Sequence, residues 1–147
     1  MKRLIYVAWI FSALVRSEKI CAAEYMSVAA PTIIYDAQSL KANKMFVASR
    51  YYPFEVMVKL SGWVKVRDAA GDMGWVEAKN LSDKRSVIVT AAQAEIYAAP
   101  DVASGMVIMA ERSVVLEPLE APAKGLVKVK HRDGQIGYVK VEQIWGQ

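Results

Sequence analysis

One pattern occurs twice in this chain, and it constrains the fold more than any other feature. Residues 62–81 read GWVKVRDAAGDMGWVEAKNL, and residues 125–144 read GLVKVKHRDGQIGYVKVEQI. The copies align without a gap, with glycines, alternating valines and a final Leu or Ile at matching places. In each copy, two short apolar runs flank a spacer that contains Asp and Gly, residue types that favour tight turns. Each copy therefore predicts a β-hairpin, and the repetition predicts two β units in tandem.

The segments around the hairpins predict further short strands. Residues 25–31 form a lead-in, and the β-branched residues 32–34 predict a first strand. Residues 54–60 alternate as in a half-buried strand, with one face formed by Phe54, Val56, Val58 and Leu60. Residues 78–81 predict a single 3₁₀ turn, and the second half repeats these elements at 87–90, 95–97, 106–110 and 114–119. Helical periodicity is missing after residue 23, which predicts an all-β fold of small barrels or sandwiches.

The N-terminal segment has the features of a secretory signal peptide. Lys2 and Arg3 precede an apolar run at residues 4–15, and small residues at 21–23 precede Glu24. A helix over that run would rise about 18 Å, which is less than the roughly 30 Å hydrocarbon core of a bilayer. Cleavage after Ala23 is therefore favoured over an uncleaved anchor, and we expect no membrane span in the mature form.

Lipidation of Cys21 is a third possibility for this segment. Glu18 and Lys19 stand where a lipidation signal requires apolar and small residues, so the sequence favours simple cleavage. The expected localisation is periplasmic or secreted.

The expected organisation is a signal peptide at 1–23, a first β domain at 24–85 and a second at 86–147. Cys21 is the only cysteine, so a chain cut after Ala23 would contain no disulfide. Domains of about sixty residues are marginally stable when they depend on a small apolar core alone. We therefore hypothesise that the two copies pack against each other and that this contact adds to the stability of both.

The net charge of +4 does not indicate a nucleic-acid partner. Residues 1–23 carry +3 of this charge, and basic and acidic residues are interspersed along the remainder. Proteins that bind DNA or RNA usually cluster their Lys and Arg on one face. We therefore expect no nucleic acid among the partners.

Residues suited to catalysis or metal binding are scarce. The predicted mature chain has no cysteine nucleophile, and the single histidine, His131, lies in a hairpin turn. Asp68 and Asp72 flank the other hairpin turn, where Asp is expected for backbone reasons. No glycine-rich loop precedes a helix, so a phosphate cradle is not indicated. The sequence predicts no enzyme, no metal and no cofactor.

Both hairpins resemble the bacterial SH3 domain. The residues that carry the resemblance are Gly-Trp-Val-Lys-Val-Arg, a turn with Gly, and Gly-Trp-Val with a following Leu. The second copy substitutes Leu126 for Trp63 and Tyr138 for Trp75. The resemblance implies two tandem small SH3-like barrels, each five- or six-stranded and partly open, after an N-terminal signal-peptide helix. It also implies an exported, non-catalytic module of the kind that binds cell-wall peptide, glycan or protein.

Strand parity suggests where a ligand would bind. Val64 and Val66 share the face suited to the core, so Trp63 falls on the polar face with Lys65 and Arg67. By the same parity, Trp75 shares the outer face with Glu77. The alternative is that both tryptophans cover barrel ends or are buried against the other copy.

The second copy keeps its valines but has fewer outward aromatic rings, so the first copy is predicted to carry the main ligand surface. The candidate ligand-binding residues are Tyr35, Tyr51, Tyr52, Trp63 and Trp75. Tyr51 and Tyr52 beside Arg50 would form a flat aromatic patch, or alternatively a loop that plugs the barrel end. The predicted function is an exported binding module for cell-wall peptide or peptidoglycan. The alternative is an envelope adaptor that binds another protein through both barrels.

Overall fold

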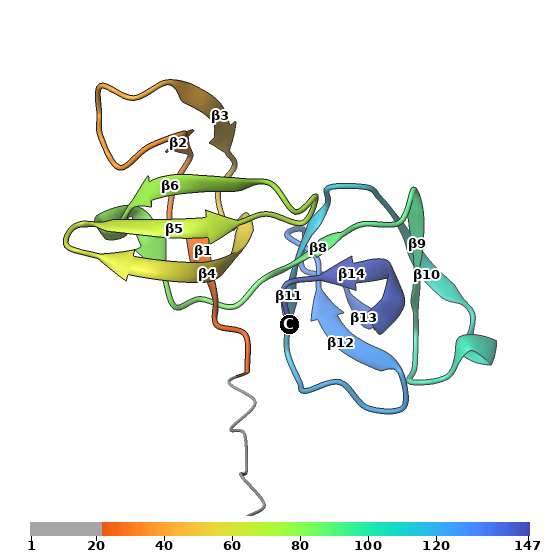
Figure 1. Cartoon of the computed structure of the whole chain (residues 1–147). Helices are drawn as coiled ribbons and strands as arrows, with labels where there is room; N and C mark the ends of the chain where they lie inside the picture. The colour runs from red at the N-terminus through yellow and green to blue at the C-terminus, as the bar shows by residue number, and fades with distance from the viewer. Residues whose placement is uncertain (1–21) are drawn as a thin grey trace, which may run out of the picture.

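A computed structural model describes residues 22–147, which form two all-β barrels (Figure 1). The predicted signal peptide, residues 1–23, lies almost wholly outside the described residues. Among residues 22–147, no helix has the length and apolar character needed to cross a membrane. The predicted all-β fold class and its two small barrels are confirmed.

The first sheet contains seven short strands in the order β3-β2-β6-β5-β4-β1-β7. Its elements are β1 (Tyr25–Val28), β2 (Thr32–Tyr35), β3 (Lys44–Ala48), β4 (Pro53–Leu60), β5 (Trp63–Arg67), β6 (Met73–Glu77), the 3₁₀ helix η1 (Ala78–Asn80) and β7 (Leu81–Ser82). Strands β5 and β6 are the predicted hairpin, with Val64 opposite Val76. The predicted 3₁₀ turn is confirmed as η1, and Leu81 packs against the core after it.

The second sheet has the corresponding order, β10-β9-β13-β12-β11-β8-β14. Its elements are β8 (Val87–Val89), β9 (Gln93–Tyr97), η2 (Val102–Ser104), β10 (Met106–Glu111), β11 (Val115–Pro118), β12 (Leu126–Lys130), β13 (Ile136–Lys140), η3 (Val141–Gln143) and β14 (Ile144–Trp145). Each strand of the second sheet has a counterpart with the same neighbours in the first. The repeated sequence thus corresponds to a repeated topology.

Each barrel has its own apolar core. Phe54, Val64, Val66 and Val76 belong to the first cluster, and Leu116, Val127, Val129 and Val139 belong to the second. Phe54 and Leu116 occupy equivalent places on β4 and β11, and each is only 1% exposed. The inward parity predicted for the hairpin valines is therefore confirmed in both copies.

Residues 25–28 were expected to be part of a lead-in, but they form strand β1 in the interior of the sheet. Ser27 pairs with Pro53 of β4 on one side and with Ser82 of β7 on the other. Its hydroxyl is fully buried and donates a hydrogen bond of 2.7 Å to the carbonyl oxygen of Lys84. The Tyr-Met-Ser-Val sequence lacks an apolar–polar alternation, so its strand character depends on these distant partners.

The expected alternation along β4 is wrong in its second half. The register shifts between Val56 and Val58, so that Val58 lies opposite Lys65 and Leu60 lies opposite Trp63. Such a bulge moves the following side chains to the other face of the sheet. Val58 and Leu60 are accordingly 44% and 46% exposed instead of facing the core.

The barrels touch through a few contacts near the linker at residues 83–86. The Ser86 hydroxyl donates a 2.6 Å hydrogen bond to the carbonyl oxygen of Tyr51. The rings of Tyr25 and Trp145 meet edge to face, with centroids 5.2 Å apart. The two copies therefore make contact through polar and aromatic groups, while their apolar cores stay separate.

Replacement of Asp68 by alanine should destabilise the first barrel by about 1–2 kcal/mol. Its carboxylate Oδ1 accepts hydrogen bonds from the backbone N–H groups of Ala70 and Asp72, each at 2.9 Å. Urea unfolding followed by circular dichroism measures the change. Asp72→Ala is the control, because the side chain of Asp72 makes no hydrogen bond within the described residues. Equal stability of the two variants would contradict the role given to Asp68.

Candidate ligand surface

Three of the five predicted ligand residues meet on the outer face of the first sheet. Tyr35 of β2 lies opposite Trp75 of β6, and Trp75 lies opposite Lys65 of β5. The ring of Trp63 meets the ring of Tyr35 edge to face, with centroids 5.6 Å apart. The Lys65 ammonium is 6.0 Å from the centroid of Trp75. Strands β2, β6 and β5 thus bring these side chains together.

The side chains of this cluster differ in exposure. Tyr35 is only 6% exposed, whereas Trp63 and Trp75 are half-buried. Tyr35 therefore supports the surface from below, and the two indole rings face solvent in part. Glu77 lies opposite Trp63 and pairs with Lys79, with 2.7 Å between its Oε2 and the ammonium. The cluster consequently presents two rings between an ammonium group and a carboxylate.

The bulge in β4 extends this surface with two aliphatic side chains that sequence reasoning missed. Val58 and Leu60 lie beside Lys65 and Trp63 on the neighbouring strand and are partly exposed. A contiguous exposed apolar patch of this kind often marks a binding site. We call the surface formed by Val58, Leu60, Trp63, Lys65 and Trp75 the outer aromatic face. Strand parity had placed Lys65 on the polar face with Trp63, although Lys65 was not among the candidate ligand-binding residues.

The second barrel has the same pairing of a tyrosine, a second aromatic ring and a lysine on its outer face, but its side chains there are more polar. Tyr97 lies opposite Tyr138, and the Lys128 ammonium is 6.0 Å from the Tyr138 centroid. Lys128 also donates a 2.9 Å hydrogen bond to Glu120, and this bond raises the pKa of Lys128. Leu126, the counterpart of Trp63, is only 8% exposed. A hollow of about 290 Å³ beside Leu126, Lys128 and Tyr138 is therefore bordered by an ion pair instead of a second indole.

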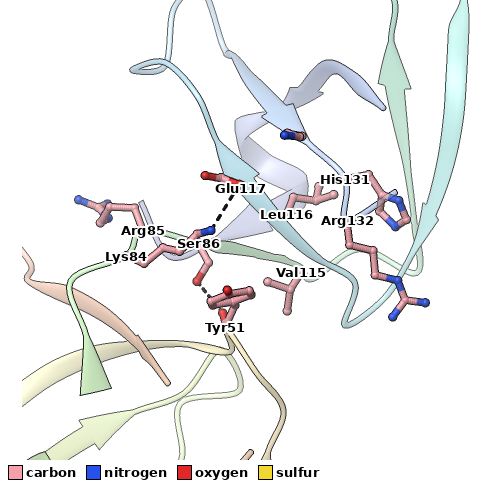
Figure 2. Close-up of a pocket in the computed structure, with 10 residues that line it drawn as sticks. Tyr51, Lys84, Arg85, Ser86, Val115, Leu116, Glu117, His131 and Arg132 are labelled. Carbon is pink, nitrogen blue, oxygen red and sulfur yellow. Dashed lines mark hydrogen bonds and ion pairs between the residues drawn. The ribbon is translucent and has the colours of Figure 1, made fainter. Parts of the chain in front are cut away.

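Tyr51 lies apart from the outer aromatic face, at the boundary between the barrels (Figure 2). Its backbone is left-handed, with φ of +66°. The Arg50 guanidinium and the Lys84 ammonium lie 4.7 and 4.5 Å from the centroid of its ring. Tyr51 therefore contacts the linker and faces the second barrel.

Tyr52 turns toward the first core instead. Its ring centroid is 4.9 Å from that of Phe54, and the side chain packs against the first core cluster. Burial raises the pKa of Tyr52, and the nearby charge of Asp68 raises it further. The flat patch expected from Tyr51 and Tyr52 together does not form, because the left-handed turn at Tyr51 directs the two rings to different places.

The described residues offer little for a metal or an acid–base pair. Residues 22–147 contain no group of three or more His, Cys, Asp or Glu side chains placed to bind a metal. In the second hairpin turn, His131 Nδ1 lies 2.9 Å from Asp133 Oδ1. A backbone hydrogen bond from Gln135, followed by the contact with His131, lowers the pKa of Asp133. The pair stabilises the second hairpin turn, and His131 stands at the position that Asp68 has in the first copy.

A comparison with protein families matches the first barrel. The family model described as "Bacterial SH3 domain" matches residues 37–83, which extend from the loop after β2 to just past β7. A comparison with curated proteins gives no match.

Solved structures of NlpC proteins are also similar. NlpC2 from Trichomonas vaginalis is 14% identical, with a TM-score of 0.39 over 85% of this chain and 48% of its own. NlpC1 from Trichomonas vaginalis is 15% identical, with a TM-score of 0.38 over 89% of this chain and 48% of its own. An NlpC/P60 family protein from Bacillus cereus ATCC 10987 is 14% identical, with a TM-score of 0.37 over 82% of this chain and 55% of its own.

This chain thus spans about half the length of those structures. The matched residues contain strands β3 to β7 and the first copy of the glycine and valine pattern. Most of the first barrel thus matches the bacterial SH3 domain, and the second barrel repeats the strand order of the first.

Proposed function

We propose that this protein is an exported, non-catalytic binding module that holds cell-wall peptide or peptidoglycan through the outer aromatic face. The observation that carries the proposal is the pair of half-buried indoles, Trp63 and Trp75, beside Lys65 on a bacterial SH3 domain. Aromatic rings supply a large contact area at a small cost in side-chain entropy. Export is part of the proposal and rests on the features of residues 1–23.

The chemistry of the face suits a short peptide or peptidoglycan fragment. The indoles and the aliphatic side chains of Val58 and Leu60 would pack against apolar groups and sugar C–H faces. The Lys65 ammonium would pair with a free carboxylate, and Glu77 would accept hydrogen bonds from amide or ammonium groups. Because Tyr35 supports Trp63 from below, the face is formed before a ligand arrives, which reduces the entropy lost on binding.

The non-catalytic part of the proposal rests on how the acidic groups are used. Asp68 Oδ1 already accepts two backbone hydrogen bonds in its turn. Asp133 is engaged by His131 in the other turn. Glu55 is bound by the guanidinium of Arg67. These carboxylates stabilise the fold, so they are poorly placed for proton transfer to a substrate.

Substitution of Trp63 by leucine should weaken binding to purified peptidoglycan about ten-fold, since a single interface tryptophan commonly contributes more than 1 kcal/mol. Leucine is the residue found at this place in the second barrel, so the fold should survive. A pelleting assay with insoluble peptidoglycan measures the affinity, and circular dichroism checks the fold. Unchanged affinity in a folded Trp63→Leu variant would overturn the proposed face.

A second candidate function, an envelope protein adaptor, is favoured by the edge strands. β3 and β10 each end their sheet, and each exposes apolar side chains: Val47 is 64% exposed and Met109 is 43% exposed. Open strand edges can add a strand from a partner protein. The double variant Val47→Ala/Met109→Ala discriminates between the candidates. A wall-binding module keeps its peptidoglycan affinity in this variant, whereas an adaptor loses capture of its partner from envelope extract.

A further inference from the structure

A cleft lies between the two barrels, apart from the outer aromatic face. Two adjoining hollows of about 240 and 500 Å³ share Tyr51, Val115, His131 and Arg132. Figure 2 shows Tyr51 reaching from the first barrel toward β11 and the second hairpin turn. The β3–β4 turn, the linker and the second barrel therefore each form part of one concave site.

The lining of the cleft is strongly basic. Its cationic side chains are Arg50, Lys84, Arg85, Lys130 and Arg132, and its only acidic side chain is Glu117. Glu117 is already paired, because its Oε2 lies 3.6 Å from the Lys84 ammonium. Within residues 22–147, no ion pair involves Arg50, Lys130 or Arg132. A concave site lined by one sign of charge concentrates ions of the opposite sign.

The backbone around Tyr51 is held firmly. Its N–H donates a 2.8 Å hydrogen bond to Val28, and its carbonyl oxygen accepts the bond from Ser86. The equivalent residue of the second barrel, Ser113, has a similar φ of +70° and also lines the cleft. The left-handed turn thus belongs to the fold, which accepts a serine there and does not require the tyrosine ring.

The ring of Tyr51 instead holds two cationic side chains in place by cation–π contacts. Arg50 and Lys84 lie within 5 Å of its centroid, at 4.7 and 4.5 Å. A cation–π contact uses the ring face and leaves the outward N–H groups free to donate hydrogen bonds. Arg50 is therefore positioned without a carboxylate partner that would occupy its donors, whereas the Lys84 ammonium also lies 3.6 Å from Glu117 Oε2.

We propose that this inter-barrel cleft binds an anion that carries carboxylate or phosphate groups. Arg50 and Lys84 would donate to it from the side of Tyr51, and Arg132 would donate from the second hairpin turn. The proposal is independent of the outer aromatic face. One barrel alone could not form this anion site, because both barrels contribute hydrogen-bond donors to it.

The test is a titration of the full chain with citrate and, separately, with pyrophosphate, followed by calorimetry and by backbone amide NMR shifts. We expect saturable binding of at least one probe, with the largest shifts at Tyr51, Ser113 and Arg132. Tighter binding of citrate would identify carboxylate as the ligand chemistry, and tighter binding of pyrophosphate would identify phosphate.

The double variant Arg50→Gln/Arg132→Gln should lose affinity for the probe at least about ten-fold, as expected for charge-assisted hydrogen bonds. Lys41→Gln/Lys140→Gln removes the same charge at residues that do not line the cleft, and its affinity should stay within about two-fold. The proposal is overturned if neither probe saturates, or if both double variants lose affinity equally.

Discussion

Replacement of Gly137 by alanine is expected to lower the free energy of unfolding of the second barrel by about 3 kcal/mol. A Cβ atom at this position would lie 2.5 Å from Ile96 Cγ2 and 2.7 Å from the carbonyl oxygen of Tyr97. That oxygen belongs to β9, which pairs with β13 through Tyr97 and Tyr138. Relief of the backbone clash requires the two strands to move apart, so the second sheet loses contact between β9 and β13.

Urea unfolding measures this loss, and hydrogen exchange assigns it to one barrel. Ile136→Ala is the control on the same strand, because Ile136 is 49% exposed and its removal should change stability by less than about 0.5 kcal/mol. Gly74→Ala in the first barrel should cost less than Gly137→Ala. Its new Cβ would meet the side chain of Ile34, but it would lie 3.3 Å from the nearest backbone oxygen, that of Tyr35. Wild-type stability of Gly137→Ala would show that β9 and β13 can separate at no cost.

Replacement of Phe54 by alanine should destabilise the first barrel by about 4 kcal/mol. Phe54 is 1% exposed and is among the largest fully buried side chains of the protein. Its removal leaves a cavity in a core that has few other large residues. A domain of this size has little stability to spare, so the first barrel should unfold at ambient temperature.

The second barrel should stay folded in the same variant, because its core cluster shares no residue with the first. Amide NMR spectra distinguish the barrels: first-barrel signals should collapse, and second-barrel signals should keep their dispersion. Phe54→Leu is the matched control, since Leu116 fills the equivalent place, and it should cost less than about 1.5 kcal/mol. Loss of both barrels together would favour the hypothesis that the copies stabilise each other.

The predictable parts of the fold are those that depend on residues close together in the sequence. A hairpin consists of two neighbouring strands and a turn, so alternating valines and turn glycines were enough to locate β5, β6, β12 and β13. Gly71 and Gly134 have φ of +93° and +97°, values that favour glycine, at matching places in the two turns. The inward direction of Val64 and Val127 follows from the same local periodicity.

The candidate surface was predictable only in part. Outward parity placed Trp63 and Trp75 on one face, and the structure joins Tyr35 to them across β2 and β6. The contribution of Val58 and Leu60 was hidden, because an alternating sequence contains no sign of the bulge that turns them outward. Adjacent residues such as Tyr51 and Tyr52 likewise gave no sign that the backbone would separate their rings.

The amino-acid pattern was thus sufficient for the all-β class, the repeated hairpins and their buried valines, since these depend on interactions between near neighbours in the chain. The strand character of β1, the shifted register of β4 and the basic cleft between the barrels depend on partners far away in the sequence. Ser27 becomes a buried strand residue because β4 and β7 supply its hydrogen-bonding neighbours. Arg50 and Arg132 come to line one cleft because the linker brings two separately folded barrels together.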